Sequence, residues 1–121
     1  MHTLESLGFG PFFSAQYELL ERPDLVPVRV ASESRGICHI HGCTSALAEL
    51  SGRLRHDLHP LERPAAGDWV AVHDDGHRAT IHHMFDRRTQ LVRRAVTSGV
   101  QAQVIAANVD QMAITVALHE P

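Results

Sequence analysis

The chain has 121 residues, 44% of them hydrophobic, and a formal net charge of −3, which suits one domain with one core. It has no apolar run of the ~18–20 residues that a membrane span requires, and its first residues lack the pattern of a signal peptide. Its two cysteines are too few for a disulfide framework. We therefore expect a cytoplasmic protein with reduced thiols and no membrane partner.

Residues 1–25 form an N-terminal arm that is rich in aromatic residues. Phe9, Phe12, Phe13 and Tyr17 lie in this arm, and the whole chain has only two further aromatic residues. Residues 4–8 have the sequence of one helical turn that ends at a glycine. We expect the arm to be helical or irregular and to pack on the body of the domain.

Residues 26–86 predict five short strands separated by turn residues. Valine alternates with other residues over 26–31, the pattern of a half-buried strand. Five antiparallel strands of this length favour an all-β fold, a five-stranded OB-fold barrel, with an SH3-like barrel as the alternative. The expected strands span 26–31, 36–42, 46–55, 68–73 and 79–85.

The third of these strands is expected to be the longest. Apolar and polar residues alternate throughout 46–55, and Gly52 lies where a bend or bulge would let a barrel turn a corner. This alternation places Arg53 and Arg55 on the outer, polar face of the strand.

Residues 87–107 are expected to form a connector that leaves the barrel, with a short helix over 101–107. Residues 108–121 contain a strand, 112–118, that is apolar on both faces. Such strands are typical of parallel sheets covered by helices. We expect it to be the first strand of a truncated α/β domain, and without its sheet the segment 111–118 would fray, fold back or pair with another copy.

Four motifs follow one another in a specific order. These are Ser-Gly-Arg-Leu-Arg at 51–55, Arg-Pro-Ala-Ala-Gly-Asp-Trp-Val-Ala-Val at 63–72, Arg-Arg-Thr-Gln-Leu-Val-Arg-Arg at 87–94, and Gln-Val-Ile-Ala-Ala-Asn-Val-Asp-Gln at 103–111. In this order, and from about residue 28 to 118, the chain resembles the ribosome small subunit-dependent GTPase A family.

The resemblance implies an N-terminal OB domain, a circularly permuted GTPase domain and a C-terminal zinc module, in a protein that acts in late maturation of the small ribosomal subunit. GTP, magnesium and zinc would belong to the domains that this chain does not include. The chain has no G-x-x-x-x-G-K-[ST] phosphate loop, no N-K-x-D motif and no lysine. We therefore expect no cofactor, no catalytic residue and no GTP hydrolysis in this chain.

All 11 basic residues are arginines, whose planar groups suit bidentate contacts with phosphate. The barrel region has only Trp69 and Phe85 as aromatic residues, too few for a protein that stacks single-stranded bases. We expect binding to ribosomal RNA of the small subunit, through phosphate and shape, with ribosomal proteins as further partners. A solvated face is the alternative for each candidate, and the arginines of 87–94 could instead pair with the GTPase domain. The candidate contacts are Arg35, Arg53, Arg55, Arg63, Arg87 and Arg88.

Two alternative functions remain open. Cys38, His39, His41 and Cys43, in a chain with ten histidines, could form a metal- or pH-responsive module. The alternation of a strand places Cys38 opposite the other three, however, so we assign no metal ligand. The second alternative is a purely structural brace for the GTPase domain.

Overall fold

The computed structural model describes Leu4, residues 7–93 and residues 103–109. The predicted strand 112–118 and its pairing with another copy lie outside the described residues. Arg94 lies outside them as well.

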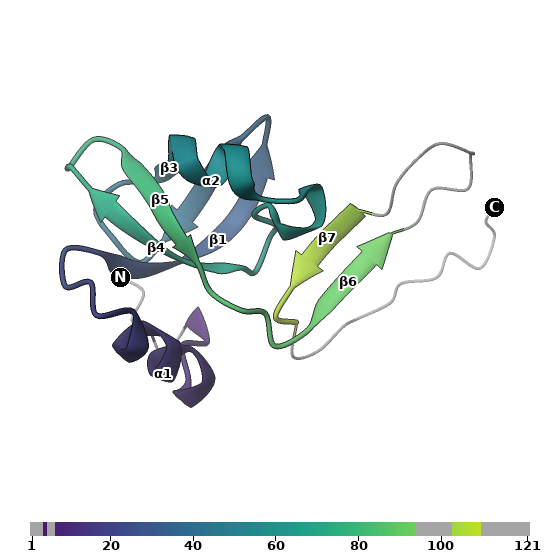
Figure 1. Cartoon of the computed structure of the whole chain (residues 1–121), viewed down its shortest axis with the longest axis horizontal. Coiled ribbons are helices and arrows are strands. Elements are labelled where there is room, and N and C mark those ends of the chain that lie inside the picture. Colours follow the sequence, from purple (N-terminus) through teal and green to yellow (C-terminus); the bar gives the residue numbers. More distant parts are fainter. Residues whose placement is uncertain (1–3, 5–6, 94–102, 110–121) are drawn as a thin grey trace, which may run out of the picture.

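Five strands close into a barrel in the order β1-β2-β3-β5-β4 (Figure 1). All neighbouring pairs are antiparallel except β3 and β5, which run parallel. This mixed arrangement confirms the predicted all-β, OB-like barrel, but the expectation of five antiparallel strands was wrong at this one pair. A parallel pair needs a long crossover, which residues 51–78 provide. The strands are β1 (Val26–Ser34), β2 (Ile37–His41), β3 (Leu47–Leu50), β4 (Trp69–Asp74) and β5 (Ala79–Met84).

One hydrophobic cluster fills the barrel. The strands contribute alternate residues to it, as expected for sheets with one inward face. Burial of each larger aliphatic side chain contributes roughly 1.5–3 kcal/mol. The buried members of the cluster are Val28, Val30, Cys38, Ile40, Ala48, Leu50, Leu54, Val70, Val72, Ala79 and Ile81.

The predicted N-terminal arm contains one helix, α1 (Pro11–Leu20). Pro11 occupies the first turn, where its missing N–H leaves no hydrogen bond unmade. The helix ends at Glu21, which is left-handed with a φ of 53° and donates its N–H to the Glu18 carbonyl. Neither this ten-residue helix nor any other in the described part of the chain is long and apolar enough to cross a membrane.

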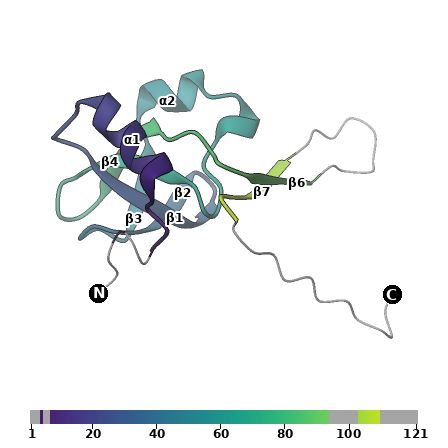
Figure 2. The same ribbon diagram turned by 90° about the horizontal axis from the view of Figure 1, so that it is seen from below.

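Helix α1 covers the outer face of the barrel at β4, which is why β4 is buried on both sides (Figure 2). Phe13 from α1 packs against Trp69, which is fully buried. The ring of Phe9 meets Trp69 edge-on, with 4.9 Å between centroids. Trp69 is therefore a packing residue at the join between arm and barrel, which confirms that the arm packs on the body.

The predicted long third strand is wrong after Leu50. Strand β3 ends there, and a short helix, α2 (Gly52–Asp57), follows. The Ser51 side chain accepts a hydrogen bond from the Leu54 N–H at 3.2 Å, which is a helix N-cap. The cap turns Leu54 into the barrel core, and it places Arg53 and Arg55 on a helix instead of a strand.

The predicted helix over 101–107 is also wrong. Strand β6 (Gln90–Arg93) pairs antiparallel with β7 (Gln103–Ala107) in a two-stranded ribbon. Val104 and Ile105 are β-branched and favour this extended conformation. The ribbon projects from one side of the barrel in both Figure 1 and Figure 2.

A close backbone approach attaches the ribbon to the barrel at Gly67. The Ala107 N–H donates to the Ala66 carbonyl at 2.8 Å, and the Asn108 side-chain amide donates to the Gly67 carbonyl at 2.9 Å. Gly67 has a φ of +94°, and a Cβ atom there would lie 2.0 Å from the Ala107 carbonyl oxygen. Only glycine satisfies both the backbone conformation and the contact.

A buried ion pair lies beside this contact. Asp68, which is fully buried, accepts two hydrogen bonds from Arg87, at 2.9 Å from Nε and 2.7 Å from Nη2. Arg87 also donates to the carbonyls of Leu61 and Arg63, both at 2.8 Å. The Ala65 N–H donates to Asp68 Oδ2 at 2.8 Å, so both charges have several hydrogen-bond partners.

Replacing Gly67 with alanine tests the close approach. We expect Gly67→Ala to lower the free energy of unfolding more than Gly76→Ala, by roughly 1–3 kcal/mol, because Gly76 has the same φ of +94° but open space around it. Denaturant titration of both variants measures the difference. Equal losses would show that Ala107 does not approach Gly67 as described.

The isosteric change Asp68→Asn tests the ion pair. It leaves the Arg87 guanidinium buried without its counter-charge, so we expect a loss of about 3 kcal/mol in the free energy of unfolding. Asp24→Asn breaks the exposed pair between Asp24 and Arg22 and serves as the control, for which we expect little change. Thermal unfolding of both variants makes the comparison, and equal effects would contradict a structural role for Asp68.

Candidate nucleic-acid interface

Three of the predicted arginines lie on α2 or in the segment that follows it. All three are exposed. Arg63 lies just after the short 3-10 helix η2 (Pro60–Glu62) and donates to the Arg55 carbonyl at 3.1 Å. Arg55 makes one long contact, 3.5 Å to the Leu50 carbonyl, and Arg53 makes no hydrogen bond or ion pair with the residues described. We call Arg53, Arg55 and Arg63 the α2–η2 surface.

Arg35 lies apart, at the turn between β1 and β2. It is exposed and left-handed, with a φ of 52°, and the Gly36 N–H beside it donates to the Glu33 carboxylate at 2.8 Å.

The two connector arginines, Arg87 and Arg88, lie in different environments. The Arg87 side chain is only 13% exposed, and its donors are occupied by Asp68 and by the Leu61 and Arg63 carbonyls. Arg87 thus pairs with Asp68 within the domain. Arg88 is exposed, and its guanidinium carbon lies 5.9 Å from the centre of the Phe12 ring.

Arg29 has a role that the sequence did not indicate. Strand alternation placed it on an outer face, yet its guanidinium donates to the carbonyls of Leu7, Gly67 (3.2 Å) and Asn108 (3.0 Å). These acceptors belong to the arm, the loop before β4 and the end of the ribbon, which are distant in sequence. Only the assembled fold brings them to one arginine.

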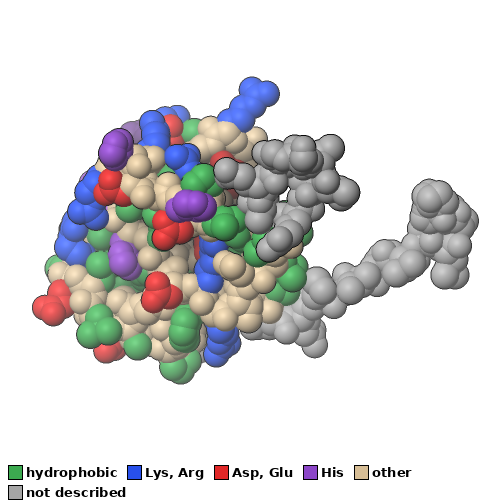
Figure 3. Space-filling model, turned by 45° about the vertical axis from the view of Figure 1, so that its right-hand side comes forward, with side chains coloured by type: hydrophobic (Ala, Val, Ile, Leu, Met, Phe, Trp, Pro, Cys, Tyr) green, Lys and Arg blue, Asp and Glu red, His purple; other side chains and the backbone are tan. Residues whose placement is uncertain are grey.

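The charges on the surface are mixed. Figure 3 shows arginine side chains at several separate places on one face, with acidic side chains and histidines between them. A protein with a net charge of −3 has no broad positive field to attract RNA. Contacts with phosphate would therefore depend on local groups of arginines.

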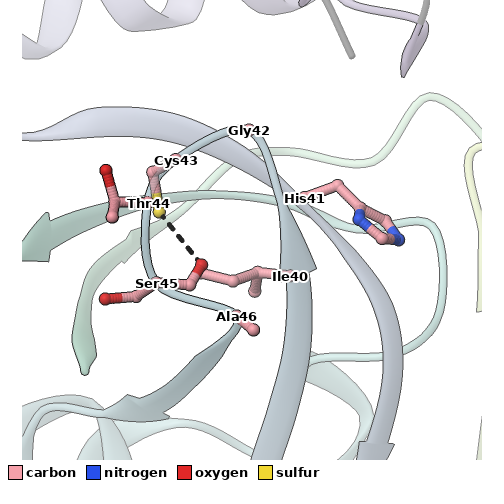
Figure 4. A pocket seen from close by; sticks show the side chains of 7 residues that line it. All are labelled: Ile40, His41, Gly42, Cys43, Thr44, Ser45 and Ala46. Atoms are coloured by element: carbon pink, nitrogen blue, oxygen red, sulfur yellow. Dashed lines mark hydrogen bonds between the residues drawn. The ribbon is translucent and has the colours of Figure 1, made fainter. Parts of the chain in front are cut away.

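The cysteine and histidine residues of β2 do not form a cluster. Cys38 lies in the barrel core, and burial raises the pKa of its thiol to about 12. Cys43 Sγ points toward the Ser45 carbonyl at 3.6 Å, and the His41 ring points away from it (Figure 4). Within the described residues no three metal-ligating side chains come together.

The hollow beside these residues is lined by residues 40–46, which are the end of β2 and the loop that leads to β3. Asp74 holds this loop by accepting hydrogen bonds from the Ser45 hydroxyl and from the Thr44 N–H at 3.1 Å. The bond from the Ser45 hydroxyl is the main cause that lowers the pKa of Asp74 to about 2. The carboxylate therefore holds the loop in place.

The similarity to known proteins covers nearly the whole chain. No protein-family model matches. The small ribosomal subunit biogenesis GTPase RsgA of Opitutus terrae is 33% identical over 96% of this chain and 35% of its own length. RsgA of Streptomyces coelicolor is 31% identical, over 96% of this chain and 31% of its own length. RsgA 2 of Vibrio parahaemolyticus is 32% identical, over 98% of this chain and 30% of its own length.

The chain thus spans about a third of the length of the relatives that it matches. Several relatives from different bacteria match the same span, and the barrel is the OB-like fold that the ordered motifs implied. The chain belongs to the RsgA family of small ribosomal subunit biogenesis GTPases.

Proposed function

We propose that this chain is an RNA-binding domain that attaches a ribosome-assembly GTPase to the small ribosomal subunit. The observation that carries the proposal is the α2–η2 surface, whose three exposed arginines form no ion pair with a carboxylate among the described residues. The relatives' names supply the context, since each is called a small ribosomal subunit biogenesis GTPase. Arg35 and Arg88 add further exposed charges, and Arg87 is left out because it is paired with Asp68.

Phosphate contacts fit the surface better than base stacking. Trp69 and Phe85, the aromatic residues of the barrel, are 0% and 3% exposed, so neither ring is available to a base. Proteins that bind single strands without sequence preference present such rings on their surface. The proposed partner is therefore folded ribosomal RNA, bound through its backbone and shape.

The junction at Gly67 favours a second function beside the first. The hydrogen bonds of Arg29 and Asn108 fix the end of the ribbon on the barrel. A barrel attached in this way can act as a brace for a following domain. The two functions predict different results for this chain alone. An RNA-binding domain should bind the small subunit by itself, and a brace should not.

Removing charge from the α2–η2 surface tests the RNA-binding proposal. We expect Arg53→Gln/Arg55→Gln to weaken binding of the 121-residue chain to small ribosomal subunits on the order of tenfold at ~100 mM salt, and to reduce the slope of log K against log salt by about 2. Arg78→Glu changes the net charge by the same amount, but at the turn between β4 and β5, at the opposite end of the barrel from α2. It should have the smaller effect.

Filter binding or sedimentation over a salt series provides these values. Absence of wild-type binding at low salt would favour the brace, and a flat salt response would contradict arginine–phosphate contacts.

We further propose that GTP hydrolysis belongs to other parts of the RsgA proteins. This chain has no phosphate loop and no lysine that could hold the phosphates of a nucleotide. We expect no release of phosphate from GTP by the purified chain, with or without magnesium and small subunits. Turnover that survives repeated purification, and that scales with the concentration of this chain, would contradict the assignment.

A further inference from the structure

Three segments that are distant in sequence enclose a small hollow beside α2. It is lined by Arg22, Ser51, Arg53 and His82, and it has a volume of about 250 Å³. The Ser51 N–H donates to the Ile81 carbonyl at 2.9 Å, which places the start of α2 next to His82 on β5. Arg22 comes from the link between α1 and β1. The barrel and the N-terminal arm are both needed to build this hollow.

The lining residues offer hydrogen-bond donors and no carboxylate. Arg53 and His82 make no hydrogen bond or ion pair within the described part of the chain. The Ser51 hydroxyl accepts from the Leu54 N–H at 3.2 Å, and its own proton has no acceptor among those residues. This leaves three donor groups around one space with their donors unused.

Arg22 is held in place at the side of the hollow. Its guanidinium donates to Asp24 through Nε at 2.9 Å and Nη2 at 2.8 Å. That pairing neutralises its charge but leaves the protons on Nη1 without an acceptor in the described residues. The local positive charge is therefore carried by Arg53, while Arg22 contributes a positioned donor.

We propose that this hollow binds one phosphate group of an RNA backbone. A guanidinium, a hydroxyl and an imidazole that converge on one space match the acceptor oxygens of a phosphate, and charge-assisted bonds of this kind are the stronger ones. The volume exceeds that of several water molecules, at ~30 Å³ each, so a phosphate and its remaining waters fit. The inference rests on the proposed RNA-binding function and adds Arg22, Ser51 and His82 to the interface.

The first arm of the test uses inorganic phosphate and the full 121-residue chain. We expect the ring resonances of His82 in NMR spectra to shift saturably as phosphate is added, and this response to be lost in Arg53→Gln. It should persist in Arg78→Gln, which removes the same charge four residues before His82, roughly 13 Å away along an extended chain. Unchanged His82 resonances in the wild type, or an equal response in Arg53→Gln, would overturn the phosphate site.

The second arm measures binding to purified small ribosomal subunits. We expect Arg53→Gln and His82→Gln each to weaken binding roughly tenfold relative to Arg78→Gln, with thermal unfolding confirming that all variants are folded. Binding that is equal in all variants would overturn the hollow as an RNA contact while leaving the proposed function in place. No binding by the wild type would contradict the proposed function, and phosphate binding in the first arm would then show an anion site independent of RNA.

Discussion

The ion pair between Asp68 and Arg87 is the interaction on which the arrangement of the molecule depends. Asp68 lies where β4 begins, and Arg87 lies where the chain leaves the barrel. Two charges with little exposure to water are stable only when each finds several partners, and Arg87 finds them in the Leu61 and Arg63 carbonyls. The pair thus ties the loop after α2 to the start of β4, and a hydrogen bond from Arg87 to the Gln90 side chain at 3.1 Å extends the link to the ribbon.

Burial and nearby hydrogen-bond acceptors divide the arginines into two groups. Arg29 and Arg87 donate to backbone carbonyls and to Asp68 inside the domain, and they stabilise the joins between its parts. Arg53 and Arg55 carry the same side chain on an exposed helix, where few acceptors are near. Burial and the supply of acceptors, rather than residue type or charge clustering, decide which arginines remain available to a phosphate.

Local patterns predicted the barrel because alternation decides which residues of β1, β2, β4 and β5 face its core. Alternation predicted the wrong structure after Leu50 because a strand and a capped helical turn can both bury Leu54. The hydrogen bond from the Leu54 N–H to the Ser51 side chain favours the helix. The ribbon was missed because its ladder joins residues 90–93 and 103–107, which no local pattern connects. The sequence indicated six candidate arginines, which are Arg35, Arg53, Arg55, Arg63, Arg87 and Arg88. It did not indicate the structural roles of Arg29 and Arg87 or the place of His82, because these depend on contacts between distant segments.

In the function that we propose, RNA lies against α2 and the hollow beside it. Ultraviolet crosslinking of the chain to small ribosomal subunits, with the crosslinked peptides identified by mass spectrometry, tests this most directly. We expect crosslinks within residues 51–63 and at the end of β5 around His82. Crosslinks confined to the loop at 40–46 and the turn at 74–78, on the opposite end of the barrel, would contradict it.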